Sequence, residues 1–127
     1  MSALLDTSVV IDVLRARPEA LSFVRSLEEP PTCSELTRVE VMRGVRSGER
    51  APTERLLQAL RWAHVDEAVA RRAGELGRRY GRSHAGLGVA DLVVAATALE
   101  LGLPLATANV RHYPMFPEVV APYAPAP

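Results

Sequence analysis

The sequence predicts an α/β fold in which a short central parallel sheet is covered by helices on both faces. Short apolar segments alternate along the chain with longer segments of helical periodicity. The short segments lack the apolar and polar alternation of a half-exposed strand, so we expect a sheet that is buried on both faces. The 127 residues, 48% of them hydrophobic and 24% charged, are enough for one domain with a core.

The first half of the chain is predicted to hold two strands and four helices. Apolar residues before Asp6 give a buried strand, and Thr7 or Ser8 suits the cap of the helix that follows. Pro18 and Pro52 each open a helix, because proline is tolerated in a first helical turn. The predicted elements are strand 3–6, helix 7–17, helix 18–29, strand 31–34, helix 35–48 and helix 52–63.

The second half is predicted to hold the most buried helix. The helix before it has one apolar stripe, whereas residues 89–102 are apolar nearly all round, which indicates a central helix that ends at Gly102. We expect one domain over residues 1–120 and a flexible tail over 121–127. The remaining predicted elements are strand 64–66, helix 67–81, loop 82–88, strand 104–108 and a strand around 118–120.

Composition excludes several classes of protein. The 15 basic and 15 acidic residues balance, so overall charge does not direct the chain to nucleic acid or to a membrane surface. The apolar start is interrupted at Asp6, which is too early for a signal peptide or a membrane span. Cys33 is the single cysteine, which excludes an internal disulfide and a cysteine-based zinc site. A cytoplasmic protein is expected, because a lone cysteine fits a reducing compartment.

Four polar residues are predicted to gather at one edge of the sheet. Asp6 and Asn109 follow strand ends, Asp91 begins the apolar helix, and Glu40 lies near the start of the helix after the second strand. Ligands of open parallel sheets bind outside the carboxyl ends of the strands. Three carboxylates in one crevice repel each other unless a cation neutralises them. Oxygen ligands alone favour Mg²⁺, with Mn²⁺ as a substitute, and the site suits phosphodiester hydrolysis.

Each of these residues also has a simpler interpretation. Asp6 and Asp91 could simply cap helix N-termini or interact with the helix dipole there, because aspartate is common at such positions. Asn109 is a common turn residue, and Thr37 with Glu40 fits a capping box. Their convergence at one edge is what favours a shared site.

Three motifs carry a resemblance to a known family. In order and spacing, "LLDTSVVIDVL", "LTRVEVMRGV" and "GVADLVVAATALELGLPLATANVRHYPMF" resemble the PIN-domain ribonucleases, and within them the VapC toxins of type II toxin-antitoxin pairs. The resemblance implies a PIN-like three-layer α/β/α fold and a Mg²⁺-dependent endoribonuclease. It makes Asp6, Glu40 and Asp91 the acidic ligands, with Asn109 at the fourth catalytic position. Asp6 and Asp91 are the expected metal-binding pair, and Thr7 and Thr107 are the expected supporting polar groups beside the site.

The expected partners follow from the same resemblance. A VapB-type antitoxin would block the site, and the toxin would form a homodimer. Candidates for the dimer surface are apolar residues of the first helices, such as Val9, Val10, Leu14 and Phe23. RNA needs positive surface near the carboxylates, where each phosphate contact adds salt-dependent affinity. The candidates for that surface are Arg78, Arg79, Arg82 and Arg111.

Two other functions stay open from the sequence. One is a housekeeping PIN-domain nuclease that processes RNA without an antitoxin. The other is a non-catalytic binding module on the same fold, in which the acids serve only as helix caps.

Overall fold

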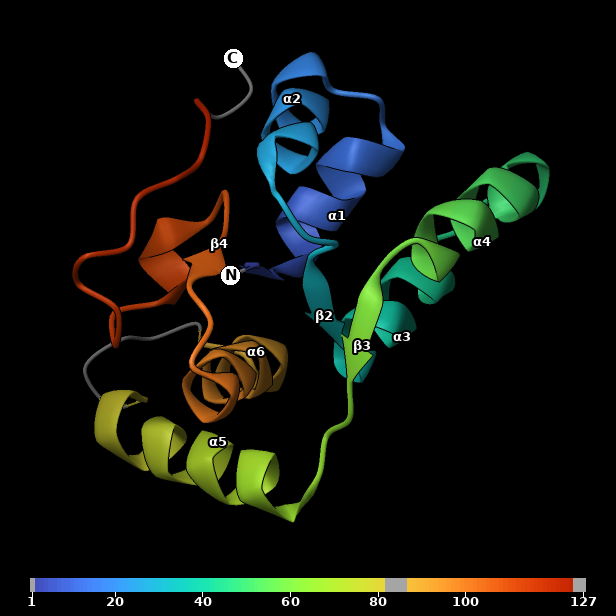
Figure 1. Ribbon diagram of the computed structural model, residues 1–127. Helices are drawn as coiled ribbons and strands as arrows, with labels where there is room; N and C mark the ends of the chain where they lie inside the picture. Colours follow the sequence, from blue (N-terminus) through green and yellow to red (C-terminus); the bar gives the residue numbers. More distant parts are fainter. Residues whose placement is uncertain (1, 82–86, 125–127) are drawn as a thin grey trace.

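Four short parallel strands form the central sheet of the structure, a computed structural model that describes residues 2–81 and 87–124 (Figure 1). The strand order is β3-β2-β1-β4. The central strand β1 pairs through Leu4 with Thr32 on one side and with Leu105 on the other. The strands are β1 (Leu4–Leu5), β2 (Thr32–Ser34), β3 (Arg61–Ala63) and β4 (Leu105–Ala106).

Helices cover both faces of this sheet, which confirms the predicted three-layer α/β/α architecture. Leu5 belongs to a core with side chains of α1 to α4, whereas its neighbour Leu4 packs with α6, because successive residues of a strand face opposite sides. The helices are α1 (Thr7–Leu14), α2 (Pro18–Ser26), α3 (Glu35–Arg43), α4 (Arg50–Gln58), α5 (Glu67–Tyr80) and α6 (Val89–Leu101), with short 3₁₀ helices η1 (Ser47–Glu49) and η2 (Val110–His112).

Helix α6 is the buried helix that the sequence predicts. Residues 93–98 are all buried, and Gly102 ends the helix at φ +64°, a left-handed conformation that favours glycine. Helix α5 packs its stripe of Val69 and Ala73 against Val93 and Ala96. A Cβ atom at Gly77 would lie 3.1 Å from the Cδ1 atom of Leu92, so the end of α5 lies against the start of α6.

Three element predictions are wrong. The third strand is Arg61–Ala63 and not 64–66, so the preceding helix ends at Gln58. Helical periodicity extends through Trp62, but pairing with β2 overrides it: Arg61 N–H donates to Pro31 O at 2.9 Å. No strand occupies 118–120, where a turn closes through a bond from Val119 N–H to Phe116 O.

The first helices contribute core residues. Val9 and Val10 are 0% and 1% exposed, which removes them as candidates for a dimer surface. Among the helices within residues 2–81 and 87–124, none has the length and apolar character needed to cross a membrane.

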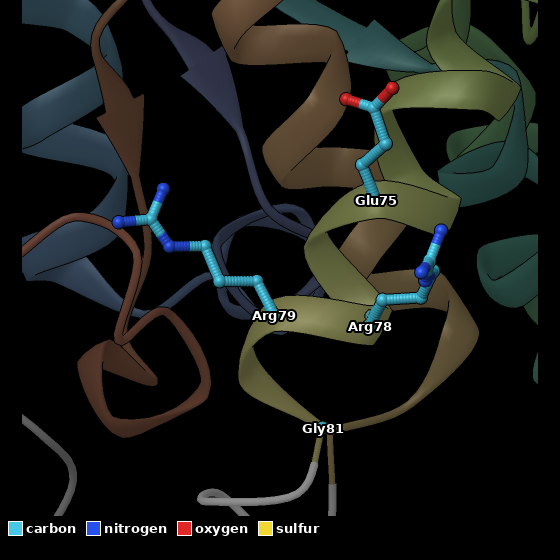
Figure 2. A pocket seen from close by; sticks show the side chains of 5 residues that line it. Glu75, Arg78, Arg79 and Gly81 are labelled. Atoms are coloured by element: carbon cyan, nitrogen blue, oxygen red, sulfur yellow. The ribbon is translucent and has the colours of Figure 1, made fainter.

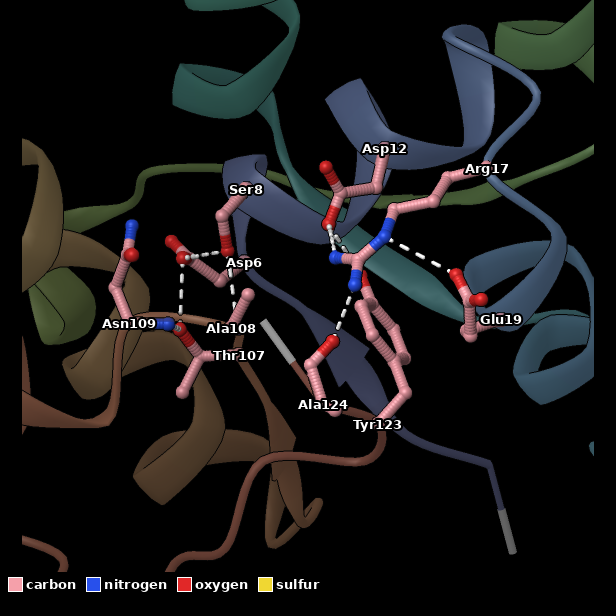
Figure 3. Close-up of polar contacts among 10 residues, drawn as sticks. All are labelled: Asp6, Ser8, Asp12, Arg17, Glu19, Thr107, Ala108, Asn109, Tyr123 and Ala124. Carbon is pink, nitrogen blue, oxygen red and sulfur yellow. Dashed lines mark hydrogen bonds and ion pairs between the residues drawn. The ribbon is translucent and has the colours of Figure 1, made fainter. Parts of the chain in front are cut away.

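The last described residues lie against α1 and α2. The Tyr123 hydroxyl donates to Asp12 Oδ2 at 2.7 Å, and the Arg17 guanidinium lies 5.0 Å from the centre of the tyrosine ring (Figure 3). Arg17 also donates to the carbonyl oxygen of Ala124. These contacts connect the C-terminal segment to the N-terminal helices; residues 125–127 lie outside the described residues.

Candidate active site

Asp6 lies at the carboxyl end of the central strand, where the sequence places it. Its backbone N–H continues the pairing with β4 by donating to Ala106 O at 2.9 Å. Its carbonyl oxygen accepts from Val9 N–H and Val10 N–H, so Asp6 is the N-cap residue of α1. The side chain makes no cap hydrogen bond and is left for other partners. Asp6 is only 5% exposed, and a carboxylate buried to that degree needs polar partners.

Two hydroxyl groups bind one oxygen of the Asp6 carboxylate. Ser8 Oγ lies 2.7 Å and Thr107 Oγ1 lies 2.9 Å from Asp6 Oδ2 (Figure 3). Both hydroxyls also accept a backbone N–H: Ser8 from Ala108 at 3.1 Å and Thr107 from Asn109 at 2.9 Å. Each therefore has its own proton available for the carboxylate.

A third hydroxyl, from Tyr113, binds the other oxygen of Asp6. Tyr113 follows η2, is 1% exposed and donates to Asp6 Oδ1 at 2.7 Å. Burial and the nearby charge of Asp6 raise the pKa of this phenol, and the charges of Asp91 and Glu40 raise it further. The negative charges of three carboxylates, one after β1, one in α6 and one in α3, thus all disfavour ionisation of this hydroxyl. Nothing in the sequence pattern singles out Tyr113 as a site residue except its position in the same segment as Asn109.

Glu40 is held at the site by Thr7, not by a capping box. Thr7 Oγ1 lies 2.6 Å from Glu40 Oε1 and 3.0 Å from Thr37 Oγ1. One hydroxyl carries one proton, so Thr7 donates to the carboxylate and Thr37 donates to Thr7. The capping-box interpretation of Thr37 and Glu40 is wrong, because α3 is capped by Ser34, whose Oγ accepts Leu36 N–H at 3.1 Å.

Asp91 lies in the first turn of α6, with its side chain 19% exposed. Its Oδ2 atom accepts Gly88 N–H at a distance of 3.4 Å, so Asp91 does interact with the N-terminus of its own helix, as the simpler interpretation of this residue expects. The same oxygen lies 3.3 Å from Nδ1 of His112 in η2. This contact brings the segment after β4 against the start of α6.

The structure joins Asn109 to this network through its backbone. Its N–H donates to Thr107, while its side chain is exposed. Among the described residues, no three acidic, histidine or cysteine side chains are gathered closely enough to hold one ion together. The donor set that lines the edge nevertheless consists of carboxylate and hydroxyl oxygens, which suits a hard divalent cation.

The predicted arginines that the structure describes are exposed. Arg78 and Arg79 are exposed in the last turn of α5 and extend from different sides of the helix (Figure 2). With Glu75 and the glycines 77 and 81 they line a pocket of about 530 Å³. Arg111 is exposed in η2, next to His112. Arg82 lies outside the described residues.

The chain is similar to known proteins along nearly its whole length. A family model described as "PIN domain" matches residues 3–115. "Ribonuclease VapC19" of Mycobacterium tuberculosis is 42% identical over 123 residues, covering 94% of this chain and 98% of that protein. "Ribonuclease VapC10" of the same organism is 40% identical, covering 95% and 92%. A solved "toxin-antitoxin complex from Klebsiella pneumoniae" superposes with a TM-score of 0.85 at 29% identity, covering 98% of this chain and 100% of that one.

Proposed function

This chain belongs to the PIN domain family, among the VapC ribonucleases, and from that premise we propose that it is the toxin of a toxin-antitoxin pair. In this proposal the protein is an endoribonuclease that hydrolyses RNA phosphodiester bonds at the acidic edge of the sheet. It works in the cytoplasm, where RNA is present and the buried thiol of Cys33 stays reduced.

The observation that carries this proposal is the set of contacts that connects three carboxylates from separate elements. Glu40 accepts from Thr7, the neighbour of Asp6 in the chain. Asp91 contacts His112, the neighbour of Tyr113, whose hydroxyl binds Asp6. Acidic groups kept together at a sheet edge need compensation by a cation. PIN-domain ribonucleases are generally metal-dependent. Here Asp6 and Asp91 would hold Mg²⁺ or Mn²⁺, with Glu40 and Asn109 completing the catalytic set.

A divalent ion would supply an activated water and stabilise charge on the phosphoryl oxygens. The chain itself orients the acids: hydroxyls hold Asp6, Thr7 holds Glu40, and His112 contacts Asp91. These contacts fix the carboxylates before substrate arrives, so less conformational freedom is lost in the reaction.

RNA binding is assigned to these arginines. Along the sequence, Arg78, Arg79 and Arg82 precede Asp91, and Arg111 follows Asn109. Guanidinium groups bind phosphate oxygens in pairs of hydrogen bonds, which suits the backbone of single-stranded RNA. This surface compensates for the repulsion between RNA and the carboxylates.

The proposed inhibitor is a VapB-type antitoxin, supported by the toxin-antitoxin complex to which the fold is similar. A groove of about 340 Å³ reaches Glu40 from the surface between α1 and α3. Ile11, Leu14 and Val45 give it an apolar lining that suits an apolar peptide segment. A basic side chain of that segment would meet Glu40. A homodimer of the toxin is part of the proposal and rests on the resemblance to VapC toxins.

Inducible expression of matched variants tests this function. Asp91→Asn removes a charge from the start of α6, whereas Glu100→Gln removes one from its far end. We expect wild type and Glu100→Gln to arrest growth and to create new RNA 5′ ends. Asp91→Asn should lower cleavage by about 10²-fold or more, as loss of a group acting on developing charge does.

Each outcome separates the proposed function from its alternatives. Cleavage by wild type without growth arrest supports a housekeeping nuclease. Absence of metal-dependent cleavage by purified wild type supports a binding module. Equal cleavage by Asp91→Asn and wild type contradicts the assignment of the site.

A further inference from the structure

Tyr113 provides a hydroxyl to which the proposed reaction gives no role. A carboxylate has about four in-plane lone pairs with which it accepts hydrogen bonds or binds a cation. In Asp6, Oδ2 accepts from Ser8 and Thr107, and Oδ1 accepts from Tyr113. The donor directions are fixed, because the serine and threonine hydroxyls each accept a backbone N–H as well.

Three of the four lone pairs of Asp6 are therefore engaged by hydroxyls. Oδ2 has both of its lone pairs occupied, and Oδ1 has one left. The remaining lone pair, on Oδ1, is the direction in which Asp6 can bind a cation.

The position of the Tyr113 hydroxyl is set by packing and not by the carboxylate. The ring is buried in the core with Leu4, Val94 and Ala98, and it stacks on Phe116 with ring centres 6.4 Å apart. A ring enclosed in this way has one orientation, since close-packed cores leave little room for another.

We propose that Tyr113 is a positioning residue that orients Asp6 so that this carboxylate binds the divalent ion through Oδ1 alone. The inference rests on the proposed function, in which Asp6 is a metal ligand. Hydrogen bonds to a ligating carboxylate fix its direction, and their removal typically costs 10- to 100-fold in metal affinity or activity. Tyr113 therefore affects metal binding without touching the metal or the RNA.

The chain offers a matched control for Tyr113→Phe. The Tyr123 hydroxyl also donates to a carboxylate at 2.7 Å, but this carboxylate belongs to Asp12, outside the site. Tyr123→Phe thus removes the same group from an equally short bond. Tyr113→Phe should lower the melting temperature more, because its bond is buried and that of Tyr123 is part-buried, while only Tyr113→Phe should affect the metal.

The test is titration of each purified protein with Mn²⁺, followed by electron paramagnetic resonance, with circular dichroism to verify folding. We expect the Kd for Mn²⁺ to rise about 10-fold or more in Tyr113→Phe, the lower end of the range for such partners. The Kd of Tyr123→Phe should equal that of wild type. Unchanged affinity in folded Tyr113→Phe, or the same loss in both variants, overturns the proposal.

A second measurement does not depend on the folding of Tyr113→Phe. Binding of Mg²⁺ at Oδ1 polarises the bond to the phenol, so wild type and Tyr123→Phe should both show a tyrosine ultraviolet difference spectrum on Mg²⁺ addition. Its absence overturns the inference. The proposed function fails separately: in that case wild type neither binds Mn²⁺ more tightly than Asp6→Asn nor cleaves RNA.

Discussion

Replacing Thr107 by valine tests how strongly the hydroxyl network stabilises the protein. Thr107 is 0% exposed, donates to Asp6 and accepts Asn109 N–H, and valine has nearly its shape. A hydrogen bond to a charged group contributes about 1.5–3 kcal/mol, and the bond from Asn109 adds about 1 kcal/mol. We therefore expect Thr107→Val to lower the free energy of unfolding by about 2.5–4 kcal/mol. That is a large part of the 5–15 kcal/mol typical of a domain.

Thr97→Val is the matched control. Thr97 is equally buried, but its hydroxyl donates at 2.7 Å to Val93 O within α6. That carbonyl keeps its helical partner when the hydroxyl is lost, so we expect a change within about 1 kcal/mol. Urea unfolding of both variants and wild type measures the difference. Equal losses in the two variants would refute the argument that the bonds to Asp6 and Asn109 set the cost.

Three further predictions concern helix α5, the buried thiol and the arginine surface. Gly74→Ala should raise the free energy of unfolding by up to about 1 kcal/mol, because alanine favours a helix interior. Gly81→Ala should lower the free energy of unfolding, because the added Cβ would lie 2.5 Å from the backbone oxygen of Gly77. Thermal unfolding of the two variants compares these effects. Burial and the charge of Asp6 raise the pKa of Cys33 from 9.0 to about 12, so only the unfolded chain ionises its thiol between these values. Stability then falls as pH rises through that window, by about 1.4 kcal/mol per pH unit, and urea unfolding should show a flatter profile for Cys33→Ala. In filter-binding assays, Arg78→Gln should reduce the slope of log affinity for RNA against log salt concentration by about 0.7. Arg72→Gln is the control and should leave this slope unchanged, because Arg72 already pairs with Glu100 in the wild type.

The sequence alone predicts the three-layer arrangement and the position of Asp6 at the end of a strand. Asp6 follows an apolar segment too short for a helix, and parallel strands bring their carboxyl ends together, so its place follows from local pattern and topology. The helix over 89–102 was equally clear, because apolar residues all round it require burial.

Other features depend on contacts between distant residues. Trp62 continues a helical pattern, and only pairing with β2 shows that it belongs to a strand. The ring of Tyr113 is a core aromatic, as a sequence pattern would suggest. The role of its hydroxyl depends on the hydrogen bond to Asp6, which lies 107 positions away in the sequence. The resemblance makes Thr7 a supporting group, but only the fold shows that its partner is Glu40 on another helix.

The long separation between Asp6 and its hydroxyl partners bears on how the protein is made. Thr107 and Tyr113 are 101 and 107 positions downstream of Asp6, so they are synthesised well after it. A nascent chain on the ribosome carries the central acid early but lacks β4 and the groups that orient it. Under the proposed function, we expect the nuclease to become competent only after Tyr113 has emerged and β4 has paired with β1.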